Sequence, residues 1–310
     1  MDEFAFIEYL RKKAPCSSRV VIGIGDDAAV LKVSKGKRLV VSSDVIVEGV
    51  DFRMKELNPE QVGRKALAVN LSDMAAMGAM PTAFMVNIGK PSRTTSAWLK
   101  RFYKGLLALA KQFDVVCVGG DFSKSKEFVA SVTIFGEASP GRIVKRSGAK
   151  PGDWIAVTGA LGGSLSRHHY DFTPRVREGL WLAQNVKPTA MIDISDGLIQ
   201  DLSHILKSSK VGAVLDLDKI PVSRDARAMS RGNEVQALGR ALSDGEDFEL
   251  LFMVSPTHKV KLEKLWKDRF PGTQLSWIGR VDGKVSKIFW RKDGIKVSEP
   301  KLVRKGFSHF

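Results

Sequence analysis

The sequence predicts a protein of two domains, each of mixed α and β structure. Three observations support this prediction. The chain has 310 residues, which is enough for two ordinary domains with apolar cores. Short runs rich in Val, Ile and Phe alternate with helical patterns along its length. Gly, Lys and Pro are crowded over residues 145–154 before a new apolar run begins, so the predicted domains cover residues 1–148 and 149–310.

The first predicted domain contains strand-like runs separated by helical patterns. Residues 1–13 read as a surface helix, because Glu8 interrupts their apolar stretch. The pair Asn58-Pro59 is typical of a helix start, and a second helix is predicted over residues 95–112. The predicted strands cover residues 38–44, 82–89, 115–121 and 128–136.

The second predicted domain follows the same alternation from residue 154 onwards. Its predicted helices cover residues 176–184, 198–208, 224–240 and 257–268. Its predicted strands cover residues 154–159, 190–195, 212–217, 248–254, 274–281 and 286–291. Both halves are therefore expected to contain helices packed on a sheet.

The composition is that of an ordinary globular protein, with 44% hydrophobic and 27% charged residues. No apolar run reaches the roughly 18 residues of a membrane helix, and the N-terminal segment carries acids where a signal peptide carries positive charge. We expect a cytoplasmic protein with no membrane partner. The two cysteines, Cys16 and Cys117, lie in no metal or redox motif, and Cys117 is predicted to be a buried small hydrophobe.

The net charge of +15, with a pI near 9.8, permits two interpretations. One is attraction to anions, either a polyphosphate substrate or a nucleic acid. The other is a solvated basic surface, which we favour because the Lys and Arg residues are scattered rather than gathered in one arm. A nucleic-acid-binding protein remains the alternative from a different functional class.

Aspartates recur where apolar runs end in a Ser or Gly context. They lie at or next to the ends of the segments 22–27, 40–44, 69–73, 117–121 and 192–197. Two bare carboxylates about 4 Å apart repel by roughly 4 kcal/mol at an effective dielectric of 20, so a cluster of them must hold protons or bind metal. Mg²⁺ prefers oxygen ligands and bridges carboxylates to phosphates. The pattern therefore indicates metal-dependent phosphoryl transfer.

The same aspartates have a purely structural interpretation. Each one alone is more simply explained as a helix cap or turn former, whereas five in one setting favour a shared site. The Walker loop and the protein-kinase motifs are missing. No nucleophilic triad appears either, so we predict no acid, base or nucleophile of the protein itself. The pair His168-His169 is interpreted as surface polar residues.

Seven ordered motifs make the sequence recognisable: IGIGDDAAVL, SSDVIVEGVDF, KALAVNLSDMAAMGAMP, VGGD, RSGAKPGDWIAVTG, IDISDGLIQDL and GEDFELLF. From about Ile22 to its last residue the chain resembles the thiamine-monophosphate kinases, whose superfamily includes aminoimidazole ribonucleotide synthetase and selenophosphate synthetase. The resemblance implies the two-domain α/β fold of that superfamily. It implies a homodimer formed by the N-terminal mixed sheet, and a C-terminal domain that covers nucleotide and substrate. The implied reaction is magnesium-dependent transfer of the ATP γ-phosphoryl to thiamine monophosphate.

The resemblance also assigns site residues to positions of this sequence. The implied magnesium ligands are Asp27, Asp44, Asp73, Asp121, Asp193 and Asp196, with Ser42 and Ser43 adjoining the metal. The implied ATP contacts are Gly120, Arg146 and Ser195. The implied substrate contacts are Asp51, Glu246 and Phe307.

The chain departs from the family pattern mainly on the acceptor side. Asp51 stands where the family often has histidine, and Asp244 replaces the first glycine of the usual GGED. Phe122 follows GGD where threonine is common, and the segment after Ser164 is short. ATP and magnesium use is thus more firmly implied than the acceptor. The alternative within enzymes is another ATP-using member of the superfamily with a different acceptor.

Overall fold

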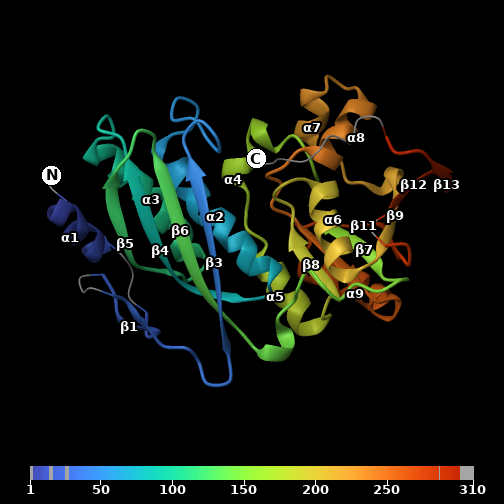
Figure 1. Ribbon diagram of the computed structural model, residues 1–310, viewed down its shortest axis with the longest axis horizontal. Coiled ribbons are helices and arrows are strands. Elements are labelled where there is room, and N and C mark those ends of the chain that lie inside the picture. The colour runs from blue at the N-terminus through green and yellow to red at the C-terminus, as the bar shows by residue number, and fades with distance from the viewer. Residues whose placement is uncertain (1–2, 14–16, 25–27, 286, 301–310) are drawn as a thin grey trace. The chain divides into compact units, whose positions relative to one another are not determined.

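The computed structural model describes residues 3–13, 17–24, 28–285 and 287–300, which form two compact units. The first unit comprises residues 1–74 with 79–141, and the second comprises residues 75–78 with 142–310. Each unit combines helices with a sheet, which confirms the predicted mixed class (Figure 1). Among the described helices none is long and apolar enough to cross a membrane.

The first unit is built on a four-stranded sheet with the order β3-β6-β4-β5. Its strands are β3 (Arg38–Val47), β4 (Met80–Lys90), β5 (Val116–Lys124) and β6 (Val129–Ala138). Strand β6 is antiparallel to both β3 and β4, whereas β4 and β5 are parallel. All four predicted strands are confirmed to within three residues at each end.

Two helices cover one face of this sheet, α2 (Pro59–Ala76) and α3 (Ser96–Gln112) (Figure 1). As predicted, Pro59 opens α2 and a second helix starts near Thr95. The structure shows that Thr95 caps α3 by accepting a hydrogen bond from the Trp98 N–H at 3.1 Å. The two helices approach each other closely at Gly63 of α2. A Cβ on Gly63 would lie 2.0 Å from the carbonyl oxygen of Phe102, so only glycine fits at this crossing.

The N-terminal segment adds α1 (Glu3–Lys13) and a small antiparallel pair, β1 (Val20–Ile22) with β2 (Val30–Leu31). The predicted N-terminal helix is therefore confirmed. Phe6 and Leu10 of α1 are buried, and the Phe6 ring contacts Tyr103 and Phe122.

The second unit is built on a seven-stranded sheet with the order β13-β12-β9-β11-β7-β10-β8. Its strands are β7 (Trp154–Thr158), β8 (Ala190–Asp193), β9 (Gly212–Asp216), β10 (Leu250–Val254), β11 (Leu275–Asp282), β12 (Ile288–Lys292) and β13 (Ile295–Val297). Only the β12–β9 pairing is parallel among these described strands.

The helices of the second unit connect these strands. They are α4 (His168–Asp171), α5 (Val176–Asn185), α6 (Leu198–Ser209), α7 (Arg224–Met229), α8 (Glu234–Ser243) and α9 (Pro256–Arg269), with short 3₁₀ turns η1 (Pro140–Arg142), η2 (Ser164–Ser166) and η3 (Leu217–Lys219). Apolar residues of α6 and α8 pack against alternate side chains of β7, β9 and β10 to form the main core.

Two predicted elements differ from the structure. The helix predicted over residues 224–240 is divided into α7 and α8, because Arg231 and Gly232 have positive φ angles and Asn233 caps a new helix. The strand predicted from residue 248 begins at Leu250, because Phe248 also has a positive φ of 49°. The residues just before β10 therefore form a bent loop.

Candidate active site

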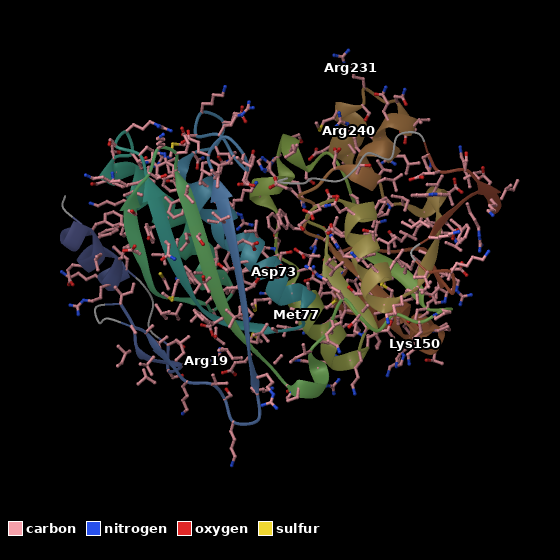
Figure 2. The ribbon with its side chains drawn as sticks, viewed as in Figure 1. Arg19, Asp73, Met77, Lys150, Arg231 and Arg240 are labelled. Atoms are coloured by element: carbon pink, nitrogen blue, oxygen red, sulfur yellow. The ribbon has the colours of Figure 1, made fainter. Side chains whose placement is uncertain are left out.

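A polar cluster lies in the first unit where β3 faces α2. The Ser42 hydroxyl donates a hydrogen bond to Asp73 Oδ2, and the Asp44 N–H donates to Asn70 Oδ1 at 3.2 Å. Asp73 is labelled on α2 in Figure 2. Alternate residues of a strand share a face, and so do residues three apart on a helix, which is why these four meet. The structure thus brings Ser42, Asp44 and Asp73 together and adds the buried Asn70, which the sequence analysis missed.

Ser43 lies apart from this cluster. Its hydroxyl donates to the carbonyl oxygen of Val132 at 3.1 Å and lies 3.0 Å from Thr133 Oγ1. Its side chain is on the opposite face of β3 from Ser42, because neighbouring strand residues point in opposite directions. Only the main chain of Ser43 adjoins the Ser42–Asp73 contact.

Asp121 occupies the other edge of the same sheet. The strand registers align Asp44 with Val132, Val86 and Gly120 in one row across the sheet. Three strand spacings separate the ends of that row, or about 14 Å. The exposed Asp121 follows Gly120 and therefore faces the opposite side. Within one chain, Asp44 and Asp121 cannot bind the same ion.

Gly120 allows β5 to lie against β4 at this point. Its φ is 153°, and a Cβ there would lie 1.9 Å from the carbonyl oxygen of Val86. Gly120 is also exposed, so its main chain is accessible for a close backbone contact with a ligand. Asp27 and Phe307, which are also assigned by resemblance, lie outside the described residues.

Asp51 is held by the turn that follows β3. Its Oδ2 accepts a hydrogen bond from the Val47 N–H at 2.7 Å, and its carbonyl oxygen accepts one from the ammonium of the fully buried Lys65 at 2.7 Å. These contacts give Asp51 a structural part in shaping the turn. A contact between Asp51 and a substrate stays a prediction.

A second acidic cluster lies in the second unit, between β8 and α6. Asp193 ends β8, Asp196 lies in the next loop, and Asp201 is in the first turn of α6. Burial, together with the negative charges of Asp193 and Asp196, raises the pKa of Asp201 to about 8. Oδ2 of Asp201 accepts hydrogen bonds from the N–H groups of Asp196 at 3.0 Å and Gly197 at 3.1 Å.

The donor set of this cluster suits a divalent cation. Ligand atoms of Asp196, Asp201 and His204 lie within 4.8 Å of one another. A cation here would stabilise the ionised form of Asp201, whose charge is otherwise opposed by burial and by two neighbouring carboxylates. Asp201 and His204 were missed in the sequence analysis. Asp201 belongs to the motif IDISDGLIQDL, but an acid in a first helical turn has an ordinary explanation in the helix dipole.

The loop over residues 244–249 contacts the loop after β8. The N–H of Glu246 donates to the Ser195 carbonyl oxygen at 2.7 Å, and the N–H of Phe248 donates to the Ile194 carbonyl oxygen at 2.8 Å. Glu246 and Phe248 both have positive φ angles, 63° and 49°. Residues other than glycine rarely adopt this backbone conformation. Where they do, the position is often part of a functional site.

His169 is buried against this loop, so the prediction that it lies at the surface is wrong. It is 8% exposed, and its Nδ1 lies 3.2 Å from Glu246 Oε2. The short helix α4 turns the His169 ring inward, an arrangement that sequence spacing does not reveal. Nε2 of the neighbouring His168 lies 3.1 Å from the carbonyl oxygen of Asp247.

The glycine-rich segment after β7 uses its N–H groups on carboxylates of the protein. Asp247 is buried and accepts hydrogen bonds from the N–H of Gly162, at 2.9 and 3.1 Å, and from the Ser164 hydroxyl. Burial raises the pKa of Asp247 well above its usual range. Gly163 donates its N–H to Asp244 Oδ2 at 3.1 Å. This segment therefore holds the loop over residues 244–249 in place.

An ion pair anchors the far end of the same loop. The Arg175 guanidinium donates to both carboxylate oxygens of Glu249, at 2.7 and 2.5 Å, and Thr158 Oγ1 donates to Glu249 at 2.5 Å. The Glu249 side chain is 3% exposed. Arg146, by contrast, is exposed, and its carbonyl oxygen accepts a hydrogen bond from the Ser209 hydroxyl at 3.2 Å.

Comparison with known proteins identifies the relatives of this chain. The family profile described as AIR synthase related protein, N-terminal domain, matches residues 25–138. The thiamine-monophosphate kinase of Rhodopirellula baltica is 37% identical, over 99% of this chain and 97% of its own length. That of Escherichia coli K12 is 36% identical, over 99% of this chain and 98% of its own length. The chain belongs to the thiamine-monophosphate kinase family.

Solved structures of the family have the same fold. The thiamine-monophosphate kinase from Stenotrophomonas maltophilia superposes with a TM-score of 0.81 at 34% identity, covering 96% of this chain and 98% of the other. AaThiL, solved in complex with AMPPCP and TMP, superposes with a TM-score of 0.70 at 30% identity, covering 99% and 97%. The hydrogenase maturation protein HypE of E. coli has a TM-score of 0.76 at 17% identity, which shows the shared fold alone. The predicted superfamily fold is confirmed.

Asp244, which the sequence analysis singled out as a departure from the expected motif, makes two polar contacts. Besides accepting from Gly163, Asp244 pairs with Arg240 at 3.2 Å and ends α8. A glycine at this position lacks both contacts. Asp244 therefore ties α8 to the glycine-rich segment.

Proposed function

We propose that this chain is an ATP-dependent kinase that phosphorylates thiamine monophosphate to thiamine diphosphate, with ADP as the second product. Full-length similarity to thiamine-monophosphate kinases, at 37% identity over 99% of the chain, carries the proposal. The complex of AaThiL with AMPPCP and TMP, at 30% identity, supports both substrates. We take AMPPCP as the stand-in for ATP with a methylene in place of the β–γ bridging oxygen.

Magnesium is proposed to bind at carboxylates in both units. Asp44 and Asp73 with Ser42, and separately Asp121, are the proposed ligands of the first unit. Asp193, Asp196 and Asp201 are those of the second unit, where burial first, and then the two neighbouring carboxylates, raise the pKa of Asp201. Bound Mg²⁺ would neutralise phosphate charge. Within one chain Asp44 and Asp121 are too far apart to share an ion, so we propose a separate ion for each. Asp27 remains a predicted ligand.

The nucleophile needs no base from the protein. The second pKa of a phosphate monoester lies near 6, so the acceptor oxygen of thiamine monophosphate is largely ionised at neutral pH. The protein must bring two anions together and orient them for in-line attack. We therefore expect no phosphorylated enzyme intermediate, and inversion of configuration at phosphorus.

Four further residues are proposed to bind the substrates. ATP is proposed to contact the exposed main chain of Gly120, the exposed guanidinium of Arg146 and the loop residue Ser195. Glu246 is proposed to contact the acceptor. His169, 3.2 Å from its carboxylate, is proposed as a positioning residue that fixes the Glu246 rotamer.

The first unit carries an apolar surface that suits a homodimer. Leu39, Val41 and Val45 alternate along β3 on the face opposite α2 and are 49%, 52% and 51% exposed. Exposed apolar rows of this kind mark interaction surfaces. We propose that a second copy covers this face, so that Val41→Lys yields a monomer by light scattering. The cytoplasmic location stays a prediction.

The proposal is tested by incubating the protein with MgATP and thiamine monophosphate and separating the products by chromatography. We expect thiamine diphosphate and ADP in equal amounts, and neither when one substrate is omitted. Asp44→Asn and Asp121→Asn should each lose most turnover, while Asp114→Asn, a matched control on an exposed turn with a positive φ, should retain it. ATP turnover that requires a different acceptor would contradict the thiamine assignment.

A further inference from the structure

The seven-stranded sheet of the second unit presents a second face, opposite its core helices α6 and α8. The strand registers align Phe289 of β12, Val214 of β9, Arg280 of β11 and Trp154 of β7 in one row across four adjacent strands. Their sequence neighbours Trp290, Leu215, Val281 and Ile155 belong to the core on the other face. By strand alternation, the row therefore points away from that core.

Aromatic and basic side chains interleave on this face. Lys259 lies over the rings of Trp154 and Trp277, with its ammonium 4.7 and 5.1 Å from the two centroids, and Arg280 lies 4.4 Å from the Trp154 centroid. At the other end of the row, the ammonium groups of Lys284 and Lys296 lie 5.3 and 5.1 Å from the Phe289 centroid. Five cation–π contacts thus share one sheet face.

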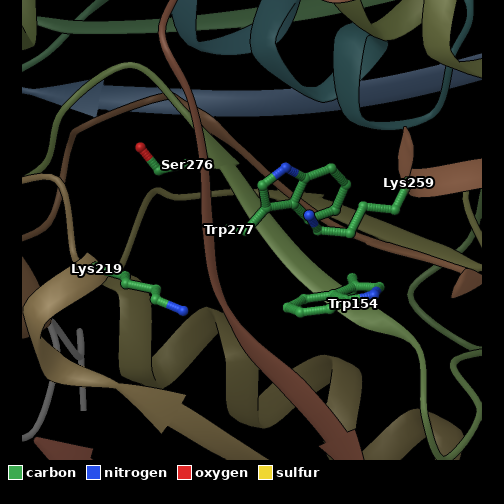
Figure 3. A pocket seen from close by; sticks show the side chains of 5 residues that line it. All are labelled: Trp154, Lys219, Lys259, Ser276 and Trp277. Carbon is green, nitrogen blue, oxygen red and sulfur yellow. The ribbon is translucent and has the colours of Figure 1, made fainter. Parts of the chain in front are cut away.

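A cavity of 380 Å³ opens beside the tryptophans. Trp154, Trp277, Lys219, Lys259 and Ser276 line it, and Figure 3 shows the two indole rings with Lys259 between them and Lys219 across the opening. The two ring centroids are 6.0 Å apart. The space has the apolar ring faces and the cationic rim that a nucleobase with its phosphate requires.

The face stays basic although it also carries Asp282, two residues after Arg280 on β11. Lys259 pairs with Glu263 at 2.6 Å, and Lys219 pairs with Asp216 at 3.5 Å, so part of the charge is balanced. The cations that remain are on exposed side chains. They are Arg280, Lys284, Arg291 and Lys296.

We infer that this face binds single-stranded nucleic acid. The face is covered over β7 and β10, where Ala156 and Phe252 are buried, but the rings of Trp154, Trp277 and Phe289 remain half-buried. Such rings are a stacking platform for unpaired bases, and the interleaved cations can track the phosphates. Trp154 and Phe289 are three strand spacings apart, about 14 Å, which is about four base rises of 3.4 Å. A role in folding stability would explain the cation–π contacts. It would not explain why the rings of the row stay half-buried beside a cavity. This binding is independent of the proposed kinase reaction.

Binding is measured by fluorescence anisotropy of a labelled 12-nucleotide oligouridylate, with a 12-base-pair RNA duplex as the comparison. We expect the single strand to bind more tightly than the duplex. Trp154→Leu and Phe289→Leu, which keep apolar bulk but remove the stacking ring, should each weaken binding about tenfold. The double variant Arg280→Gln with Lys284→Gln should weaken binding and lower the slope of log K against log salt by about 1.4. The control double variant, Lys111→Gln with Lys207→Gln, changes two exposed lysines outside this face. It should leave both the affinity and the slope unchanged.

Three results would overturn the inference. They are equal affinity for the single strand and the duplex, unchanged affinity in both leucine variants, or an equal loss in the lysine control. The last would assign binding to the overall charge of +15 rather than to this face. Circular dichroism and kinase activity of each variant are recorded beside the binding. We expect both to be retained, and a folded leucine variant with unchanged binding refutes the stacking role directly.

Discussion

Replacing Arg175 with leucine tests whether the buried ion pair holds the loop that carries Glu246 and Asp247. The Arg175 guanidinium makes two hydrogen bonds to Glu249, whose side chain is 3% exposed. Removing one partner of a buried pair leaves an uncompensated charge and typically destabilises a protein by about 3–5 kcal/mol. We expect Arg175→Leu to lower the free energy of unfolding of the second unit by that amount.

Urea denaturation followed by tryptophan fluorescence suits this measurement. Of the six tryptophans only Trp98 belongs to the first unit, so the signal reports mainly the second. Arg177→Leu, an exposed neighbour on α5, is the matched control and should change stability by less than about 0.5 kcal/mol.

A double variant separates the pair from simple loss of packing. Arg175→Leu with Glu249→Leu removes both charges, so its loss should be smaller than the sum of the two single losses. An Arg175→Leu loss below about 1 kcal/mol, or strict additivity in the double variant, would refute the reasoning.

Three other predictions follow from single positions. Gly120→Ala should lower the melting temperature and abolish turnover, because its Cβ would lie 1.9 Å from the Val86 carbonyl oxygen; an active, equally stable variant would contradict this. Burial raises the pKa of the Cys117 thiol to about 12, so in a Cys16→Ser background a disulfide reagent at pH 8 should label it only when urea opens the fold. The pKa of Asp201 is about 8 in the folded state and near 3.8 in the unfolded state. Between these values the folded state keeps a proton that the unfolded state releases, so the free energy of unfolding falls as pH rises from about 4 to about 8. In EDTA, Asp201→Asn should flatten that decline, and an unchanged pH profile would exclude this carboxyl as its source.

Much of the local structure could be predicted because it depends on neighbours in the sequence. Asn58-Pro59 and Thr95 begin helices through caps that reach only three residues ahead, and strands β3 to β6 follow from short apolar runs. The recurring Asp after an apolar run singled out Asp44, Asp73 and Asp196 by the same local logic. Seven ordered motifs were enough to indicate the family, which full-length identity of 37% confirms.

The partners of those residues depend on strand order and register, which bring together segments far apart in the sequence. The packing of β3 against α2 joins Ser42 to Asp73, whereas Ser43 points to the other face. The sheet order places Asp121 next to Gly120, at the far end of a row that begins about 14 Å away at Asp44. A positive φ at Glu246 is an effect of the whole loop.

The same reason explains what the sequence left hidden in the second unit. His169 became a partner of Glu246 because α4 packs it inward, although its sequence context is polar. Trp154, Arg280 and Phe289 look unrelated along the chain and form one row only because β7, β11, β9 and β12 are adjacent. Local propensity determined where the helices and strands form and which kinds of side chain each of them carries. Non-local pairing, whose free energy no short window of sequence contains, decided which of them meet.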